Sequence, residues 1–473
     1  MGLLLVVGFV LTVSTTPIND VDSYWHVAIG RQLLDRHTVD GLGTSWLAEP
    51  APPWRTSQWL SEVGMTGIVD AVGWRGLVVA RLVILAALIA AILLTTLPRR
   101  PAALGTAWAS VTVLGLIGLA QDRPQTISLL FIALLARACA QLLTGVGGPR
   151  NAAVAVTCLV WAQLHPLWLL APAAFALVLL GRLCDRRADP GVRLRPIAMN
   201  LLASLTGVLS PLGLAAFTLP LRFQQSTAHI SEWRPATIID PTAGALAVLV
   251  LLAFLACART PRSVPWSRLI WIGAWAAFAA TAFRNLGPAL LLTSPVALDC
   301  VDRAWGGRLR SWSRPNGLRE AWALALAATL PLGVGLGLTA TRLARLDPLR
   351  QTPARSLAER LARSSTPVRV FNAYDTSGAL VAFGGGKPRL AVDGRADMWG
   401  GAYIDKIIDA QGLAPGWQST FTAFHPDAAL LARRAPLAVL LVQQGSWSIA
   451  AQDDDYVLLM PRSPGARGPT AAP

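Results

Sequence analysis

Residues 16–37 read TPINDVDSYWHVAIGRQLLDRH and follow directly on the first apolar run of the chain. Asp20 and Asp22 stand one residue apart at the point where hydrophobic residues give way to polar ones. An aromatic pair, a histidine and an amphipathic run come next. The stretch has two interpretations: a helix cap with tryptophan beside it, or a metal and substrate site at a membrane surface.

The composition around this stretch is that of a membrane protein. The 473 residues are 53% hydrophobic and 14% charged, with a mean hydropathy of +0.49. A bilayer core of about 30 Å needs roughly 20 apolar residues per helix. The sequence predicts a polytopic α-helical domain over residues 1–341 with about eleven transmembrane helices. They lie near residues 2–18, 76–97, 101–120, 125–143, 151–165, 167–183, 197–217, 243–258, 267–283, 286–301 and 320–341.

The net charge of +15 follows the predicted topology. An even number of spans precedes the connections at 98–100, 144–150, 184–196, 259–266 and 302–319, so all five share one side, and together they carry fourteen arginines. The loop at 19–75 on the other side holds seven acids and four arginines. The positive-inside rule makes the arginine-rich side cytoplasmic and loop 19–75 extracytoplasmic. We therefore expect no nucleic-acid partner.

Residues 151–187 are long enough for one kinked helix or two short ones. A single helix would export Arg186 and Arg187 and invert everything that follows. Two helices that turn at His165 and Pro166 keep both arginines inside. The sequence therefore favours two helices.

Side chains capable of chemistry collect at the extracytoplasmic boundary in five connections. They are Asp20, Asp22, His26 and Glu62 in the first loop, Asp122 and Arg123 in LAQDRPQT, His165 in QLHPLW, His229, Glu232 and Arg234 in RFQQSTAHISEWRP, and Arg284 and Asn285 in AFRNLGP. Polar groups at span ends are costly unless they are paired or face a wet cavity. A local cap or a snorkelling anchor explains any one of them, but the five together predict a cavity.

The first loop also predicts two amphipathic helices. Asp22 is placed to cap a helix from residue 23 to about 35, with Trp25, Ile29 and Leu33 on one stripe. A second helix is expected from about Thr56 to just before Gly73. Both would lie on the membrane surface and roof the cavity. The simpler alternative is that Asp22 only caps, Asp20 is solvated and the tryptophans sit in the interfacial belt.

These motifs resemble known membrane proteins. An acidic D-x-D pair just after the first transmembrane helix, followed by two surface helices, resembles the GT-C superfamily of integral-membrane glycosyltransferases. DVDSYWHVAIGRQLLDRH and PWRTSQWLSEV also resemble a group of bacterial multipass proteins with D-x-D-x-W-W-H-L-x-x-G and W-L-x-E patterns, although Tyr24 replaces the first tryptophan. Further similar fragments are DRPQ (122–125), WAQLHP (161–166), SEWRP (231–235), RNLGP (284–288), FNAYDTSGALV (371–381) and AVDGRADMWGG (391–401).

The resemblance implies sugar transfer from a polyprenyl-phosphate carrier to a glycan, lipid or protein acceptor on the outer face of a bacterial cytoplasmic membrane. Arginines suit a lipid-phosphate leaving group because guanidinium binds phosphate with two N–H donors. Arg123, Arg234 and Arg284 are the candidates. The general base for the acceptor hydroxyl is Asp20 or Asp22. Alternatively, these two carboxylates bind a divalent cation, Mg²⁺ or Mn²⁺.

The remaining candidates are expected to bind substrate at the same face. They are His26, Glu62, Asp122, His165 and Glu232. Two other functions stay open: a non-catalytic protein of the same fold that binds lipid-linked glycans, and a transporter or flippase. A transporter favours internal repeats with broken helices at mid-depth, and the sequence shows no such repeat.

The chain changes character after the last predicted span. Residues 342–365 read as an arginine-rich linker, 366–462 as a small extracytoplasmic α/β domain, and 463–473 as a disordered tail. Expected strands are VRVFNAY (368–374), ALVAFGG (379–385), RLAVDGR (389–395), LAVLLVQQ (437–444) and YVLLMP (456–461), with helices near 400–412 and 425–434. GGGKP (384–388) reads as a turn. Asp393, Arg395 and Asp397 form either a salt-bridged structural loop or an acceptor-binding one.

Overall fold

The structure is a computed structural model that describes residues 2–98, 100–145, 147–186, 193–219, 231–260, 264–310 and 318–462. The chain folds as two compact units. Unit 1 comprises Met1–Pro17, Val72–Ala216 and Ser231–Pro348, and unit 2 comprises Ile18–Ala71, Phe217–Ile230 and Leu349–Pro473. The sequence assigned 19–75 to the membrane domain as a loop, whereas the structure packs Ile18–Ala71 with the C-terminal part of the chain.

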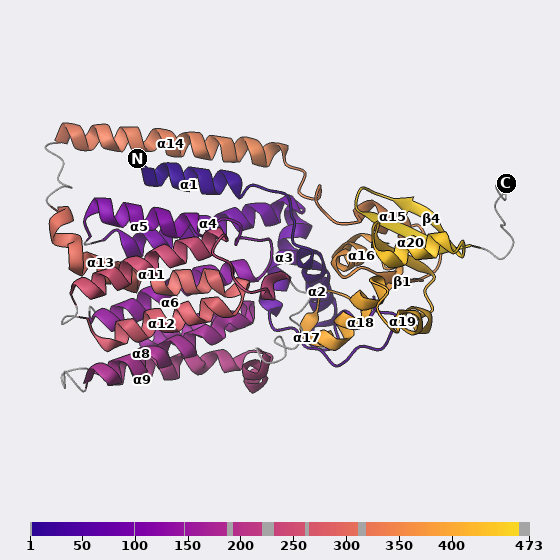
Figure 1. Cartoon of the computed structure of the whole chain (residues 1–473), viewed down its shortest axis with the longest axis horizontal. Helices are drawn as coiled ribbons and strands as arrows, with labels where there is room; N and C mark the ends of the chain where they lie inside the picture. The colour runs from indigo at the N-terminus through magenta and orange to yellow at the C-terminus, as the bar shows by residue number, and fades with distance from the viewer. Residues whose placement is uncertain are drawn as a thin grey trace. The chain divides into compact units, whose positions relative to one another are not determined.

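Unit 1 is a bundle of helices (Figure 1). Its α-helices are α1 Gly2–Val13, α4 Arg75–Thr96, α5 Ala102–Leu114, α6 Gln125–Thr144, α7 Asn151–Leu164, α8 Leu170–Arg186, α9 Arg195–Ser204, α11 Pro241–Arg259, α12 Trp266–Thr281, α13 Leu286–Arg310 and α14 Leu318–Arg345. Its short 3₁₀ helices are η1 Pro166–Leu169, η2 Leu205–Leu209, η3 Gly213–Thr218, η4 Ser231–Trp233 and η6 Phe283–Asn285. A helix therefore lies in the region of each predicted span.

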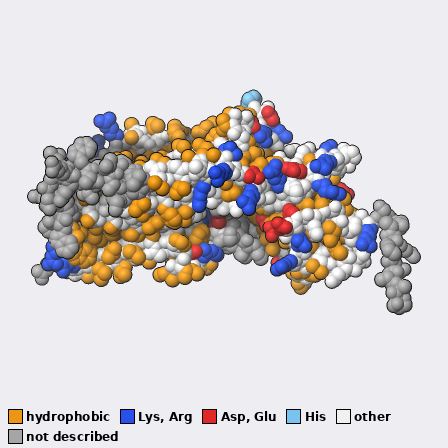
Figure 2. Space-filling view, turned by 90° about the horizontal axis from the view of Figure 1, so that it is seen from above, with side chains coloured by type: hydrophobic (Ala, Val, Ile, Leu, Met, Phe, Trp, Pro, Cys, Tyr) orange, Lys and Arg blue, Asp and Glu red, His pale blue; other side chains and the backbone are white. Residues whose placement is uncertain are grey.

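Several of these helices suit a bilayer. Among the described residues, four helices are long and apolar enough to cross a membrane: Arg75–Thr96, Gln125–Thr144, Pro166–Arg186 and Pro241–Arg259. Hydrophobic side chains cover much of the visible face of the helical unit (Figure 2). On α4, for example, Val83 and Leu94 are each 62% exposed, which suits contact with lipid. The total of eleven spans stays a prediction.

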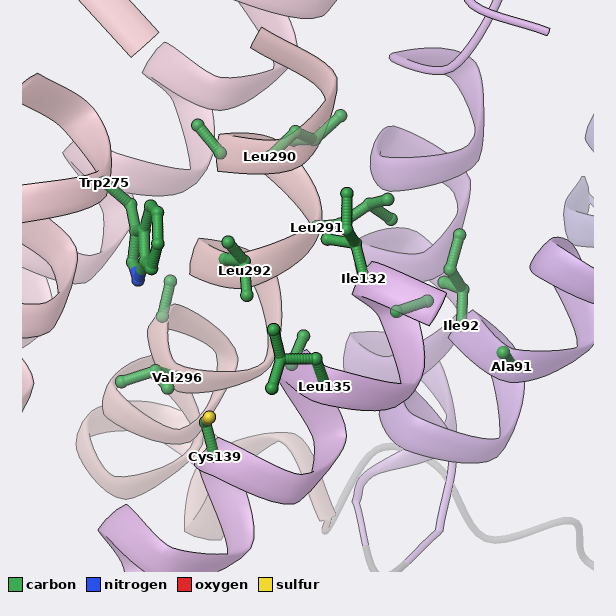
Figure 3. Packing of buried hydrophobic residues seen from close by; sticks show 14 of the residues in the cluster. Ala91, Ile92, Ile132, Leu135, Cys139, Trp275, Leu290, Leu291, Leu292 and Val296 are labelled. Carbon is green, nitrogen blue, oxygen red and sulfur yellow. The ribbon is translucent and has the colours of Figure 1, made fainter. Parts of the chain in front are cut away.

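Helix α13 is buried along most of its length. Every residue from 286 to 301 is buried, and the helix packs against α4, α5, α6, α11 and α12. Figure 3 shows Leu290, Leu291 and Leu292 of α13 among side chains of the neighbouring helices, including Ile132 and Trp275. The polar residues of this stretch have partners inside the bundle: Ser294 Oγ accepts from Trp108 Nε1 at 3.1 Å, and Asp299 pairs with Arg268 at 2.9 Å. Buried polar groups in proteins are generally paired in this way.

Small residues bring α1 and α14 together along the bundle (Figure 1). A Cβ added to Gly335 would lie 2.5 Å from the Cα of Gly8. Thr12 Oγ1 donates to the carbonyl oxygen of Gly335 at 3.2 Å. Close backbone approach through small residues is typical of helix pairs in membranes.

Two regions of unit 1 contain a break between helical segments. The predicted turn at His165 and Pro166 is confirmed: α7 ends at Leu164, His165 is extended, and η1 starts at Pro166. The single helix expected over 197–217 was wrong, because α9 ends at Ser204 and two 3₁₀ segments follow. Pro211 and Gly213 interrupt any longer helix, and Gly213 has a φ of 56°. A side chain at Gly207 would also meet the ring of Trp168 at 2.4 Å.

Unit 2 is built on a five-stranded mixed sheet in the order β2-β1-β3-β5-β4. The strands are β1 Val368–Asn372, β2 Pro388–Leu390, β3 Ala428–Ala432, β4 Trp447–Gln452 and β5 Tyr456–Pro461. β1 pairs in parallel with β2 and β3, and β5 runs antiparallel to β3 and β4. Its helices are α2 Asp22–Arg36, α3 Trp59–Val72, α15 Arg355–Leu361, η7 Tyr374–Thr376, α16 Ser377–Phe383, α17 Ala396–Trp399, α18 Gly401–Gln411, α19 Trp417–Phe424 and α20 Pro436–Gln443.

Three elements of the C-terminal part were predicted wrongly. Residues 379–385 and 437–444 were expected as strands but lie in α16 and α20, and 425–434 was expected as a helix but holds β3. Short apolar runs do not separate a buried helix from a buried strand by periodicity. β3 has partners on both sides, so tertiary pairing overrides its alanine-rich helix propensity. The turn at GGGKP is confirmed, with positive φ at Gly385 and Gly386.

The stripe on α2 faces the core of unit 2. Trp25, Ile29 and Leu33 are buried in one cluster with residues such as Leu380 of α16 and Leu390 of β2. We expected this face to lie on the membrane. The periodicity correctly predicted a buried face, but a protein core covers it.

Candidate functional site

Asp20 and Asp22 lie at the start of α2. Asp20 Oδ1 accepts a hydrogen bond from the backbone N–H of Asp22 at 3.0 Å. Asp22 is the first residue of the helix, one position later in the helix than the capping position that we expected. Its Oδ1 accepts from Trp25 Nε1 at 2.8 Å. Two carboxylates at a helix N-terminus are favoured by the helix dipole.

The Asp22 carboxylate is confined by Gly394. A Cβ added at Gly394 would lie 2.5 Å from Asp22 Oδ1 and 2.5 Å from Trp25 Nε1. The carbonyl oxygen of Gly394 accepts from the hydroxyl of Tyr374 at 3.1 Å. A glycine from the C-terminal part of the chain therefore lies against the Asp22 carboxylate, within unit 2.

His26 and Glu62 form a buried pair between α2 and α3. Glu62 Oε1 lies 3.1 Å from His26 Nδ1, and the two side chains are 0% and 4% exposed. Thr56 Oγ1 donates to Glu62 Oε2 at 2.7 Å. Gln58 Nε2 lies 3.5 Å from His26 Nε2. These contacts fit the tautomer with its proton on Nδ1, which donates to Glu62.

We expected Glu62 to bind substrate directly. Both of its carboxylate oxygens instead contact protein groups, His26 and Thr56. In a substrate site, Glu62 would therefore orient His26 and would not contact the substrate itself. The ring of His26 lies against Trp25 with a centroid distance of 3.7 Å. Trp25 in turn donates to Asp22. A chain of contacts therefore links Glu62 to the acid pair.

Asp122 forms an ion pair with a residue that the sequence analysis missed. Arg81 Nη1 donates to Asp122 Oδ2 at 2.6 Å, and the side chains are 2% and 0% exposed. Arg81 Nη2 also donates to the carbonyl oxygen of Thr16 at 2.6 Å. A lone arginine in the apolar run of α4 was the available signal, since intramembrane charges generally have a partner.

Arg123 and Glu232 form an ion pair that joins two of the predicted connections. The sequence placed both at one boundary, and the structure brings them together. His165 is also buried, and its Nδ1 accepts from the backbone N–H of Leu167 at 3.2 Å. His165 therefore caps η1. His229 lies outside the described residues.

Arg234 and Arg284 belong to two short segments that pack on each other. The N–H of Phe283 donates to the carbonyl oxygen of Arg234 at 2.9 Å. The Arg234 guanidinium lies 4.3 Å from the ring centroid of Phe283, and that of Arg284 lies 4.7 Å from the centroid of Trp233. Both contacts are cation–π arrangements.

Arg234 also pairs with an acid beyond the predicted set. Arg234 Nη2 donates to Asp240 Oδ1 at 2.5 Å. The hydrogen bond from Arg234, with others from Thr237, holds the pKa of Asp240 well below its usual range. The Arg234 side chain is 41% exposed, so it is accessible to an anionic ligand.

The predicted site residues thus divide between the two units. Asp20, Asp22, His26 and Glu62 lie in unit 2, and Asp122, Arg123, His165, Glu232, Arg234 and Arg284 lie in unit 1. The roles assigned to them stay predictions. In the part of the chain that the structure describes, no group of three or more His, Cys, Asp or Glu side chains is arranged to hold a metal ion.

The Asp393 loop forms a buried network inside unit 2. Arg395 Nη2 donates to Asp393 Oδ2 at 2.6 Å, with both side chains 1% exposed. Arg395 also donates to the carbonyl oxygens of Leu42 and Gly43 at 2.7 and 3.0 Å. Of the two interpretations for this loop, the contacts support the salt-bridged structural one.

No protein-family model and no curated protein matches the chain. Solved structures do match it. The apo crystal structure of ArnT from Cupriavidus metallidurans is 15% identical over 95% of this chain and 95% of that chain, with a TM-score of 0.52. ArnT bound to undecaprenyl phosphate is 15% identical over 97% and 96%, with a TM-score of 0.50. An oligosaccharyltransferase from Archaeoglobus fulgidus, tethered with an acceptor peptide, is 11% identical over 91% and 68%, with a TM-score of 0.49.

The similarity to ArnT concerns the fold and covers nearly the whole chain. The chain has the GT-C-type fold of integral-membrane proteins, with several apolar helices and a small sheet. The GT-C-like fold predicted from the acid pair and the two loop helices is confirmed.

Proposed function

We propose that the protein is a membrane glycosyltransferase that transfers a sugar from a polyprenyl-phosphate donor to an extracytoplasmic acceptor. The observation that carries this proposal is the acid pair at the start of α2. It directly follows the first apolar helix of a chain with the GT-C-type fold. The proposed location is a bacterial cytoplasmic membrane, with unit 2 on the outer side.

The arginines of unit 1 would bind the lipid phosphate. Arg234 and Arg284 lie on adjacent segments, and each guanidinium has an aromatic ring beside it. A guanidinium keeps its charge and offers planar pairs of N–H donors to phosphate oxygens. Arg123 adds a third guanidinium, oriented by Glu232. These side chains would stabilise the negative charge that develops on the leaving phosphate.

Asp20 or Asp22 would act as general base on the acceptor. The carboxylate takes the hydroxyl proton while the acceptor oxygen forms a bond to the anomeric carbon of the sugar. The bond from that carbon to the phosphate oxygen breaks, and its electron pair leaves with polyprenyl phosphate. Trp25 fixes the orientation of Asp22, and Glu62 fixes His26 against Trp25.

A divalent cation is the alternative role for the acid pair. Mg²⁺ is commonly held by one or two carboxylates together with substrate phosphates and water. Asp20 and Asp22 fit that donor set, since each supplies a carboxylate at one helix end. A bound Mg²⁺ or Mn²⁺ would supply Lewis-acid stabilisation of phosphate charge.

The test uses the full-length protein in nanodiscs with a panel of polyprenyl-phosphate sugars, with and without Mg²⁺ or Mn²⁺. Wild type is compared with Asp22→Asn and with Asp35→Asn, an exposed acid on the same helix as a control. We expect donor turnover to fall about 10²- to 10⁴-fold in Asp22→Asn only, at unchanged thermal stability. Turnover that survives in Asp20→Asn/Asp22→Asn would contradict the catalytic role. Saturable binding without turnover would favour the non-catalytic lipid-glycan binder, and movement of intact donor across the bilayer would favour a flippase.

A further inference from the structure

Unit 2 contains a groove that involves none of the residues discussed under the proposed function. Its volume is about 350 Å³, and it lies among α2, the loop at 45–46, α16 and the start of β2. Leu380, Val381 and Pro388 contribute apolar surface to it. The polar side chains that line it are Arg31, Gln32, Ser45 and Arg389.

Hydrogen bonds hold the walls of the groove in place. Gln32 Oε1 accepts from the backbone N–H of Gly43 at 2.8 Å, and its Nε2 donates to Ser45 Oγ at 3.3 Å. Trp46 Nε1 donates to Asp393 Oδ2 at 2.9 Å, and the carbonyl oxygen of Trp46 accepts from Leu390 at 2.8 Å. The groove is therefore largely preformed, as small-molecule sites usually are.

The lining of the groove carries positive charge. It includes two arginines and no acid. Arg31 pairs with Asp70 on α3 at 2.7 Å, but the side chains are 45% and 51% exposed, so this pair is weak and open to exchange. Arg389 Nη1 donates to the carbonyl oxygen of Gly386 at 2.8 Å. The same nitrogen lies 3.3 Å from the carbonyl oxygen of Pro388. Both contacts involve Nη1, which is one of the three nitrogens of the guanidinium group.

We infer that this groove binds the acidic group, a carboxylate or a phosphate, of a saccharide. Arg31 and Arg389 would pair with the acid, and Gln32 and Ser45 would contact hydroxyl groups. The volume lies in the range of about 300–1,000 Å³ that is usual for small-molecule sites. We identify this saccharide as the acceptor of the transfer reaction, and in that respect the inference rests on the proposed function. It predicts that the transferase modifies an acidic glycan.

The experiment measures binding of digalacturonate to the full-length protein in zwitterionic nanodiscs by calorimetry, with cellobiose as the neutral control and inorganic phosphate as competitor. Arg31→Gln and Arg389→Gln are compared with wild type. Arg36→Gln is the matched control, because Arg36 is an exposed arginine on α2 that does not line the groove. We expect saturable digalacturonate binding that weakens about tenfold in each groove variant and is unchanged in Arg36→Gln. Cellobiose should bind at least tenfold more weakly, and phosphate should compete.

Equal digalacturonate affinity in wild type and in both groove variants would overturn the inference, as would the lack of saturable binding. Repeating the titration in nanodiscs with anionic lipid separates two sources of the acidic group. An unchanged affinity supports the saccharide, whereas loss of binding would assign the groove to lipid headgroups and overturn it. Binding needs no turnover, so failure of the proposed transfer reaction would appear separately in the donor assay.

Discussion

Glu62 Oε1 lies 3.1 Å from Nδ1 of His26, and the pair is buried where α2 packs on α3. The two residues are 36 positions apart in the chain. The hydroxyl of Thr56 donates a hydrogen bond to the second carboxylate oxygen of Glu62. The first loop is therefore held by a buried polar contact as well as by the hydrophobic stripe on α2.

Glu62→Ala should destabilise the protein by about 1–3 kcal/mol, because His26 and Thr56 then lose the acceptor that they share in a buried place. A double-mutant cycle with His26→Ala should give a coupling energy of about 0.5–3 kcal/mol. The measurement is denaturant unfolding in detergent. The control is the exposed pair Arg31–Asp70 on the same helices, for which we expect a coupling of about 0.2–1 kcal/mol. Equal coupling in both cycles would contradict the structural role of Glu62.

Two glycines of the same helix pair should respond differently to alanine. A Cβ at Gly30 would lie 2.2 Å from the carbonyl oxygen of Glu62, whereas a Cβ at Gly64 would meet nothing within 4 Å. Gly30→Ala should cost about 1–3 kcal/mol because backbone must shift. Gly64→Ala should be neutral or stabilise by up to about 1 kcal/mol through helix propensity. Melting temperatures of the two variants check this, and a tolerated Gly30→Ala would mean that α2 and α3 are not in close contact.

The Arg81–Asp122 pair gives a prediction for unit 1. Arg81→Leu alone should cost about 3–5 kcal/mol, because it removes one partner of a buried ion pair. Arg81→Leu/Asp122→Leu should recover part of that loss, since no uncompensated charge remains. Unfolding in detergent is the measurement. The exposed pair Arg355–Glu359 serves as control, with an expected cost below about 1 kcal/mol. A double variant less stable than Arg81→Leu would contradict this account.

The regions of the helices in unit 1 could be predicted from sequence because long apolar runs mark them, and the α2 stripe could be predicted because it depends on local periodicity. The sequence also marks Asp20 and Asp22, because two acids stand one residue apart just after the first apolar run. It did not reveal what covers the stripe: the pattern of Trp25, Ile29 and Leu33 shows that one face is buried, and a membrane surface or a protein core satisfies that pattern equally well. The covering residues come from sequence more than 300 positions away, such as Leu380.

Pairings over long sequence separations escaped prediction for the same reason. Arg123 and Glu232 were both predicted to bind substrate, but only the fold shows that they contact each other. Arg81 was not predicted as a site residue because it lies inside an apolar helix of 22 residues and not in a connection between helices. In the C-terminal part, the run at 379–385 became a helix because it packs on α2 and α15, which its own composition does not encode.

Asp393 and Asp397 provide a prediction about pH, because their pKa values shift in opposite directions. Burial opposes ionisation of Asp393, but Arg395 and the indole N–H groups of Trp46 and Trp399 outweigh it, so its pKa is lowered. Burial raises the pKa of Asp397 despite a hydrogen bond from Trp54 Nε1. The ordinary carboxyl pKa of an unfolded Asp is about 3.9.

Proton linkage determines whether each carboxylate stabilises the protein more at high or at low pH. Asp393 contributes stability that is present above pH 3.9 and is lost as the pH falls through its lowered folded pKa. Asp397 contributes stability that is present below pH 3.9 and is lost as the pH rises through its raised folded pKa.

Melting temperatures of wild type, Asp393→Asn and Asp397→Asn should therefore be measured from pH 4 to pH 8. Asp393→Asn should be less stable than wild type at pH 7 by about 3–5 kcal/mol, because Arg395 then keeps a buried charge without its counter-ion. Asp397→Asn keeps an acceptor for Trp54 and removes a carboxylate that burial disfavours. It should match or exceed wild type at pH 7, and any advantage should shrink toward pH 4. If both variants lose the same stability at pH 7, the two carboxylates do not differ in the way that their contacts require.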